Sequence, residues 1–287
     1  MTHACSSFIS PPAAAAGTVT LADTLTVNRI GFGAMRLTGP GIWGEPRDAQ
    51  LARRILRRAV ELGVNFIDTA DSYGPETNEQ IIAAALHPYP PGLVVATKGG
   101  LTRPGPDRFG CDARPERLRA ACEGSLRRLK VDCIDVYQLH APDPNVPLED
   151  SVGELVRLQS EGKIRYIGVS NVSIDQLRRA QQLTRIVSVQ NRYNIEDRAH
   201  EPVLEECERA GIAFITWDPL GAARRTSEHA ELRQIAHAHR LTINQAALTW
   251  LLDRSPVLLP IPGTSSLDHL EENVSAATLA AHRHRGA

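Results

Sequence analysis

The chain has 287 residues, 42% of them hydrophobic, and its 32 Lys and Arg residues nearly balance its 33 Asp and Glu residues. This length and apolar content allow one large core, and α/β barrels of this size form a single domain. The balanced charge argues against a broad electrostatic footprint for nucleic acid or for an anionic membrane surface. We therefore expect a small-molecule partner, with no nucleic acid and no membrane.

The five cysteines lie far apart in the sequence and form no C-x-x-C pair. An odd number suits a disulfide framework poorly, and no run approaches the roughly 20 apolar residues that span a bilayer. These features favour a reducing, cytoplasmic location. Residues 1–17 lack a basic segment, and Pro11-Pro12 interrupt their apolar part, so we expect a disordered leader rather than a signal peptide. Residues 18–287 are then expected to form one domain.

A short β-hairpin is predicted over residues 18–27, where apolar and polar residues alternate on both sides of Ala22-Asp23. After it, short apolar runs alternate with amphipathic stretches. Eight runs are strand candidates: 29–35, 65–69, 93–98, 133–140, 164–170, 186–190, 213–217 and 258–262. Helices are predicted over 49–62, 117–128, 148–160, 176–182, 202–209, 231–239 and 243–253.

Strands that alternate with helices at this spacing predict parallel βαβ units, in either a closed barrel or an open doubly wound sheet. An open dinucleotide-binding sheet typically carries G-x-G-x-x-G at its first strand–helix turn. Residues 31–36 read GFGAMR, which lacks the third glycine, and a long loop with Gly and Pro follows instead of a helix. The sequence therefore favours a (β/α)8 TIM barrel with an N-terminal β-hairpin.

Four polar residues stand at or just after the ends of three consecutive predicted strands: Asp68, Tyr73, Lys98 and His140. Active groups of an α/β barrel gather at the C-terminal ends of its strands. Each residue alone has an ordinary structural explanation, such as packing for a lone tyrosine or histidine and a turn or helix cap for a lone aspartate. Their combination at neighbouring strand ends points to a reaction site.

These side-chain types suit the reduction of a carbonyl group. An oxygen that gains negative charge during hydride transfer needs a proton donor and hydrogen-bond support. Tyr73 can donate the proton, Lys98 favours the phenolate by lowering the tyrosine pKa, and Asp68 balances the lysine charge. His140 would orient the substrate oxygen. A metal hydrolase would need more clustered ligands than Asp68 and His140, so no metal site is predicted.

Asp68, Tyr73, Lys98 and His140 resemble the catalytic tetrad of the aldo-keto reductases, and further motifs from about Val27 to Val274 agree. The resemblance implies a nicotinamide-dependent carbonyl reductase. Ser170, Asn171 and Gln190 resemble residues that bind the nicotinamide carboxamide. Residues 217–221 resemble the segment that forms an aromatic shelf for the nicotinamide and a loop over the pyrophosphate. Residues 261–266 and 269–273 resemble the adenosine-phosphate and adenine site.

The cofactor contacts implied by the resemblance are Gly33, Ala34, Met35, Asp68, Ser170, Asn171, Gln190, Trp217, Asp218, Pro219, Leu220, Gly221, Arg225, Gly263, Thr264, Ser265, His269, Glu272 and Asn273. Some of these segments also have ordinary explanations, such as a helix N-cap for Ser170-Asn171 or a turn for Gly263-Thr264.

This chain departs from the family pattern at the adenosine 2′-phosphate, where Ser265 and His269 replace the Lys or Arg that the family often carries. We expect Arg224 and Arg225 to supply that charge, which predicts NADPH as the cofactor ahead of NADH. Asp218 occupies a position where the family usually has a small hydroxyl residue, a change that the sequence does not explain.

The first loop, residues 37–48, together with residues 261–266 and 269–273, resembles the bacterial pyridoxal reductases within the family. This resemblance suggests pyridoxal as a substrate, in contact with Trp43, Tyr73 and His140, although an exposed loop aromatic is an equal explanation for Trp43. The last residues, 281–287, do not form the long C-terminal loop that covers the pocket in many relatives. A nicotinamide-bound sensor or accessory subunit with little turnover is the alternative to an enzyme.

Overall fold

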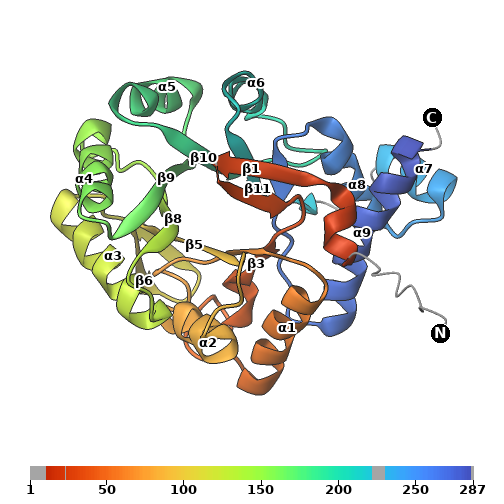
Figure 1. Ribbon diagram of the computed structural model, residues 1–287, viewed down its shortest axis with the longest axis horizontal. Coiled ribbons are helices and arrows are strands. Elements are labelled where there is room, and N and C mark those ends of the chain that lie inside the picture. The colour runs from red at the N-terminus through yellow and green to blue at the C-terminus, as the bar shows by residue number, and fades with distance from the viewer. Residues whose placement is uncertain (1–10, 23, 222–229, 286–287) are drawn as a thin grey trace, which may run out of the picture.

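The computed structural model describes residues 11–22, 24–221 and 230–285, and its centre is a ring of eight parallel strands surrounded by helices (Figure 1). Neighbouring strands pair in the order β3-β4-β5-β8-β9-β10-β11-β12. Their bounds are β3 Phe32–Gly33, β4 Phe66–Asp68, β5 Val94–Gly99, β8 Ile134–Leu139, β9 Ile164–Ser170, β10 Ile186–Arg192, β11 Ala213–Trp217 and β12 Leu258–Pro260. The predicted (β/α)8 architecture is confirmed.

The helices follow the strands and pack on the outside of the ring (Figure 1). Most of them were predicted from amphipathic periodicity, because one face of each is buried against the sheet. Their bounds are α1 Ala49–Glu61, α2 Thr77–Leu86, α3 Pro115–Leu129, α4 Leu148–Ser160, α5 Ile174–Leu183, α6 Glu201–Ala210, α7 Ala230–His239, α8 Ile243–Arg254 and α9 Leu267–Arg285. Helices α2 and α9 were not among the predicted segments; the apolar residues of α2 form a continuous run rather than a stripe.

The first and last strands of the order, β3 and β12, lie next to each other at a seam where the barrel nearly closes. The backbone N–H of Gly31 donates to the carbonyl of Pro260 at 3.0 Å. A Cβ atom on Gly263 would lie only 2.4 Å from the carbonyl oxygen of Gly33, and one on Gly33 would lie 2.7 Å from the carbonyl oxygen of Ile261. The chain therefore needs glycine on both sides of the seam, because no side chain fits between the two backbones.

The N-terminal hairpin, β1 Thr18–Ala22 and β2 Leu25–Asn28, crosses one end of the barrel (Figure 1), as predicted. Its apolar side chains join the cluster that fills the barrel interior. Buried members of that cluster are Val19, Leu21, Val27, Phe66, Val94, Ala96, Val136, Ala213, Ile215, Leu259 and Ile261. Since the hairpin covers the N-terminal end, the C-terminal ends of the strands remain for a ligand.

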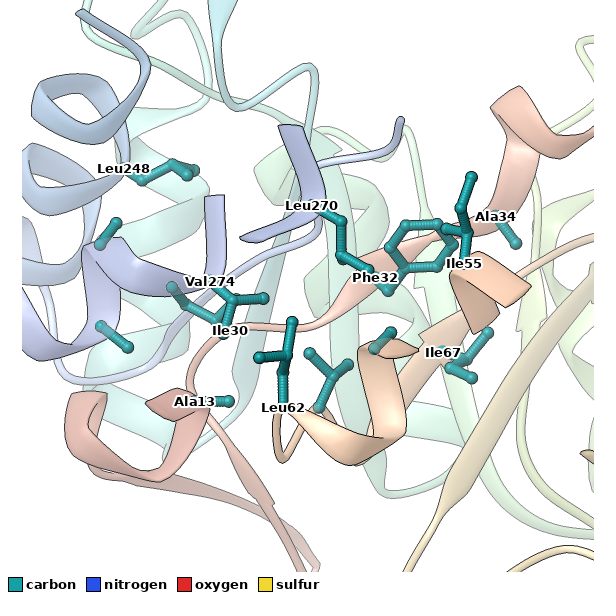
Figure 2. Close-up of a cluster of buried hydrophobic side chains, with 14 of the residues drawn as sticks. Ala13, Ile30, Phe32, Ala34, Ile55, Leu62, Ile67, Leu248, Leu270 and Val274 are labelled. Atoms are coloured by element: carbon teal, nitrogen blue, oxygen red, sulfur yellow. The ribbon is translucent and has the colours of Figure 1, made fainter. Parts of the chain in front are cut away.

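The prediction of a disordered leader through residue 17 is wrong from Pro12 onward, and residues 1–10 lie outside the described part of the chain. A short 3-10 helix, η1 Pro12–Ala16, precedes the hairpin. Ala13 is fully buried and shares a cluster with Leu62 and Val274 (Figure 2). Its N–H donates to the Leu62 carbonyl at 3.0 Å. Small alanine side chains allow this close packing against α1 and α9, which composition alone does not reveal.

A second hairpin, β6 Leu101–Gly105 and β7 Arg108–Cys111, was also not predicted. It leaves the barrel directly after β5, and Pro104 and two glycines in it are typical of a loop rather than of a strand. Its position at the C-terminal end of β5 brings it beside the residues described next.

Candidate active site

Polar residues from the C-terminal ends of β4, β5, β8, β9, β10 and β11 meet at one end of the barrel, and most of them line a cavity of about 450 Å³. The predicted residues that line it are Gly33, Met35, Asp68, Tyr73, His140, Ser170, Asn171, Gln190, Trp217, Asp218, Pro219 and Gly263. Lys98 lies behind this wall, fully buried. Sequence reasoning therefore found most of the cavity lining.

The Lys98 ammonium uses all three of its donors within this cluster. Its Nζ donates to Asp68 Oδ2 at 2.7 Å, to the Thr69 carbonyl at 2.8 Å and to the Tyr73 hydroxyl at 3.4 Å. The side chains of Lys98 and Asp68 are 0% and 2% exposed. A buried charge pair of this kind is tolerated only when its hydrogen bonds are satisfied, so the lysine charge is fixed beside the phenol.

The second oxygen of the Asp68 carboxylate is held by two amide side chains. Gln190 Nε2 donates to Asp68 Oδ1 at 2.7 Å, and Gln138 Nε2 donates to the same atom at 3.4 Å. Gln190, which the resemblance assigns to the cofactor, thus also anchors the carboxylate. Gln138 was missed, although a glutamine within the apolar strand β8, two residues before His140, is a signal for a buried polar role.

Burial raises the pKa of Tyr73 above its ordinary value. The positive charge of Lys98 lowers this pKa, but by less than burial raises it, and the negative charge of Asp68 raises it further. Lys98 thus acts in the expected direction, but burial outweighs it and the net shift of the Tyr73 pKa is upward. Burial acts to lower the pKa of Lys98, but its contacts with Asp68 and Tyr73 outweigh burial and raise it. At neutral pH the site holds an ammonium next to a protonated phenol.

His140 is neutral in this environment, since burial and then the charge of Lys98 hold its pKa well below the ordinary value. Its ring meets the Tyr73 ring edge to face, with 5.7 Å between centroids. Nδ1 of His140 lies 3.5 Å from the Ser72 hydroxyl. A neutral imidazole and a phenol thus face the same cavity, and both can donate a hydrogen bond to one oxygen atom.

Next to this pair, Asn171 joins two walls of the cavity. It adopts the left-handed conformation with φ of 56°, which asparagine tolerates better than most residues. Its Nδ2 donates to the His140 carbonyl at 3.0 Å, and its Oδ1 accepts from Trp217 Nε1 at 3.1 Å. The Ser170 hydroxyl donates to the Gln190 carbonyl at 2.7 Å. The structure thus brings the residues predicted for the nicotinamide into one cluster.

Asp218, which the sequence left unexplained, forms an ion pair. Its Oδ2 accepts from Arg192 Nη2 at 2.8 Å, and the Arg192 guanidinium lies 5.7 Å from the centre of the Trp217 ring. Asn194 Nδ2 donates to the Asp218 carbonyl at 3.0 Å. The acidic residue therefore holds an arginine against the indole, and Arg192 at the end of β10 is a site neighbour that sequence reasoning missed.

A second cation that sequence reasoning missed, Arg36, lies at the predicted phosphate end. Its Cγ is 3.7 Å from the position that a Cβ on Gly263 would take. The residue lines both the main cavity and a neighbouring cavity of about 540 Å³ that Ser265 also lines. Within the described part of the chain, Arg36 has no carboxylate partner. Arg224 and Arg225, which the sequence proposed for this role, lie outside the described residues.

Three of the remaining predicted cofactor contacts, Ala34, Leu220 and Gly221, do not line the main cavity. Ala34 and Leu220 are buried in the core, while the carbonyl of Ala34 accepts from Asn78 Nδ2 at 2.8 Å. Gly221 packs closely against the Asn194 side chain. These residues can offer a cofactor little beyond backbone groups.

At the end assigned to the adenosine, one buried polar atom lacks a hydrogen-bond partner and the other predicted side chains are exposed or hydrogen-bonded. Asn273 is buried, and its Oδ1 has no hydrogen-bond partner among the described residues. Glu272 accepts from Asn244 at 3.4 Å, His269 is exposed, and Thr264 Oγ1 accepts from the Ser266 N–H at 3.0 Å. A buried amide oxygen that lacks a partner fits the edge of a nucleotide base, so this donor and acceptor set suits a nicotinamide dinucleotide.

Trp43, predicted as a substrate contact, is 37% exposed and does not line the main cavity. Its neighbour Ile42 does, together with Leu101 and Phe109 of the unpredicted hairpin β6–β7. The substrate side of the cavity therefore has three apolar wall residues that the sequence did not identify.

A model of the aldo/keto reductase family matches residues 29–284. The chain belongs to this family. An uncharacterized oxidoreductase of Schizosaccharomyces pombe is 49% identical over 265 residues, which are 92% of this chain and 86% of that protein. Pyridoxine 4-dehydrogenase of Escherichia coli is 42% identical over 264 residues, which are 89% of this chain and 91% of that protein.

The structure of an aldo-keto reductase from Klebsiella pneumoniae, solved in complex with NADPH, superposes with a TM-score of 0.76 at 27% identity and covers 91% of this chain and 89% of that one. Family membership confirms the expected oxidoreductase class with carbonyl chemistry and a nicotinamide cofactor. Within the described ranges, no helix combines the length and apolar character needed to cross a bilayer.

Asp71, three residues after Asp68, supplies a pH-dependent test of the burial around the site. Its carboxylate is buried, Oδ1 has no hydrogen-bond partner among the described residues, and the Arg117 guanidinium is 3.8 Å from Oδ2. Burial, with the charge of Glu79, raises the pKa of Asp71 to about 7. Because the folded protein then binds a proton that the unfolded chain releases near pH 4, Asp71 stabilises the fold at low pH.

We expect the Asp71 contribution to the free energy of unfolding to fall as pH rises from about 4 to about 7, by at most about 1.4 kcal/mol per pH unit, and to level off above that. Urea denaturation of wild type and Asp71→Asn at pH 5, 6, 7 and 8 measures this difference. The variant should gain stability relative to wild type as pH rises. Parallel stability curves for the two proteins would show that the Asp71 pKa is not raised.

Proposed function

We propose that this chain reduces small aldehydes with NADPH and that Tyr73 donates the proton to the carbonyl oxygen. The observation that carries the proposal is the placement of the Tyr73 hydroxyl, 3.4 Å from Lys98 Nζ and beside His140 in one cavity. Ser170, Asn171 and Trp217 line the same cavity and offer a carboxamide-binding surface with an aromatic face. Bound reduced nicotinamide supplies the hydride.

The protein's part is to stabilise and neutralise the charge that develops on the carbonyl oxygen. The Tyr73 phenol and the neutral His140 imidazole both donate hydrogen bonds to that oxygen. The raised pKa of Tyr73 keeps the phenol protonated until the oxygen becomes basic enough to take its proton. Lys98 then faces the phenolate with a full positive charge, and Asp68 keeps Lys98 charged.

Pyridoxal is the substrate that we propose to test first. A relative named pyridoxine 4-dehydrogenase is 42% identical over most of both chains, which supports an aldehyde of this type. The apolar side chains of Ile42, Leu101 and Phe109 on the substrate side suit a single aromatic ring.

Tyr73→Phe tests the proton donor. The change removes one hydroxyl and none of the groups proposed to bind the cofactor, so chemistry and binding should separate. We expect kcat for pyridoxal reduction to fall by at least about 100-fold, because general acid catalysis and oxyanion stabilisation contribute at least that much. Absorbance of NADPH at saturating substrate measures the rate, and quenching or enhancement of nicotinamide fluorescence measures binding.

Tyr166→Phe is the matched control, because Tyr166 loses a hydroxyl that contacts Thr24 of the N-terminal hairpin, away from the site. It should keep the wild-type rate. A folded, NADPH-bound Tyr73→Phe protein that reduces pyridoxal within a few-fold of wild type would refute the assignment of Tyr73. A wild-type protein that binds NADPH tightly and reduces no aldehyde would favour a sensor or accessory role.

For the cofactor we propose that Arg36, together with Arg224 and Arg225, binds the adenosine 2′-phosphate. Arg36 occupies the space beside Gly263 and has no carboxylate partner in the described ranges, so its charge is available. We expect Arg36→Met to weaken NADPH binding by about tenfold and NADH binding by much less, since a charged hydrogen bond contributes about 1.5 kcal/mol or more.

Fluorescence titration with each cofactor measures this ratio, and Arg54→Met on the exposed face of α1 is the control for loss of one positive charge. The same titration of an Arg224→Met, Arg225→Met double variant tests the other two arginines. An equal loss of NADPH and NADH affinity would assign Arg36 to a phosphate that both cofactors share and would overturn the 2′-phosphate assignment.

A further inference from the structure

Arg103 of strand β6 joins three segments around the substrate side of the cavity. Its Nη1 donates to the carbonyls of Ile42 at 2.8 Å and Ser72 at 3.2 Å, and its Nη2 donates to the Gly41 carbonyl at 2.7 Å. Its Nε donates to the Arg108 carbonyl at 2.9 Å across the hairpin. One guanidinium therefore links the first loop, the segment that carries Tyr73 and the β6–β7 hairpin.

The same guanidinium lies over two aromatic rings. Its centre is 4.1 Å from the ring centroid of Phe109 and 5.7 Å from that of Trp43. These two rings are among the few large hydrophobic side chains that the described residues leave exposed. A planar cation attracts the faces of both rings, so Arg103 orders two side chains that the core does not cover.

The three linked segments surround the proposed substrate position. Ile42 and Phe109 line the main cavity. Ser72 directly precedes Tyr73, and the Gly74 carbonyl accepts from the Gly44 N–H at 2.9 Å, which joins the first loop to the tyrosine segment a second time. The hairpin tip also touches the first loop, since the Asp107 N–H donates to the Gly41 carbonyl at 2.9 Å. Movement of any one segment would change the cavity mouth.

From these contacts we propose that Arg103 is a positioning residue that fixes the apolar mouth of the substrate cavity and so selects flat, aromatic aldehydes over non-planar ones. The inference rests on the proposed reductase function and adds the substrate class. Arg103 is placed to act through the walls formed by Ile42 and Phe109, not on the reacting atoms. Only arginine offers five donors in a planar fork, and lysine has a single ammonium that cannot reach all of these carbonyls at once.

The test compares Arg103→Met and Arg103→Lys with wild type on benzaldehyde and cyclohexanecarbaldehyde, two aldehydes of similar size of which only the first is flat. We expect Arg103→Met to raise KM for benzaldehyde by about tenfold, with a small change in kcat, and to change KM for cyclohexanecarbaldehyde by less than about threefold. Arg103→Lys should recover part of the benzaldehyde preference. NADPH affinity should stay at the wild-type value in both variants.

Arg108→Met is the matched control, because Arg108 is an exposed arginine of the same hairpin whose side chain lies outside the cavity lining. It should leave both KM values unchanged. Chymotrypsin cleavage after Trp43 and Phe109 gives a readout that does not depend on turnover. Arg103→Met should be cleaved at these positions several times faster than wild type and Arg108→Met.

An Arg103→Met protein with the wild-type cleavage rate and the wild-type ratio of the two KM values would overturn the proposal. Equal increases in both KM values would overturn the part that concerns aromatic selection. If wild type binds NADPH but reduces neither of these aldehydes nor pyridoxal, the reductase proposal fails, and the cleavage rates alone then decide whether Arg103 holds these segments.

Discussion

The buried ion pair between Asp68 and Lys98 is the interaction on which the site depends. Both side chains are removed from water, so either charge alone would be costly at this depth. Lys98 uses all three of its donors, on Asp68, Thr69 and Tyr73, and two glutamine amides donate to the carboxylate. The pair thus orients groups from four strands, β4, β5, β8 and β10, toward one point.

The barrel provides the water-free surroundings in which the Asp68–Lys98 ion pair lies. The N-terminal hairpin fills the opposite end with apolar side chains, and the Gly33–Gly263 contact lets the seam close without side chains between the strands. Both features keep water from the barrel interior, where the Asp68 and Lys98 charges interact more strongly than they would at the surface. The ends of the strands, in contrast, form a cavity that admits a ligand.

The sequence predicted the barrel and the central residues because both leave strong local patterns. Eight apolar runs alternate with amphipathic stretches, and polar residues follow three consecutive strands at the places where barrel sites form. The hairpin β6–β7 and the role of Arg103 were missed, because carbonyls from residues 41, 42, 72 and 108 are brought together only by the fold. Arg36 was missed for the same reason, since its neighbour Gly263 is more than 200 positions away in the chain.

The net upward shift of the Tyr73 pKa was not predicted, because composition reveals the nearby lysine but not the depth of burial. Similarly, the order at η1 depends on how closely Ala13 approaches Leu62, which no periodicity encodes. The role of Asp218 depends on the Arg192 guanidinium beside Trp217, a contact that the sequence does not show. These residues share a property: their roles depend on long-range contacts rather than on neighbours in the sequence.

The central claim is that Asp68 and Lys98 act as one unit that enables Tyr73 to transfer its proton. A double-mutant cycle on the single-turnover rate of pyridoxal reduction by NADPH-loaded protein tests it most directly, with wild type, Asp68→Asn, Lys98→Met and the double variant, each confirmed to be folded. The account predicts strong non-additivity, in which either single change costs nearly as much rate as both together. Losses that simply add, or a folded single variant that reacts at the wild-type rate, would contradict it.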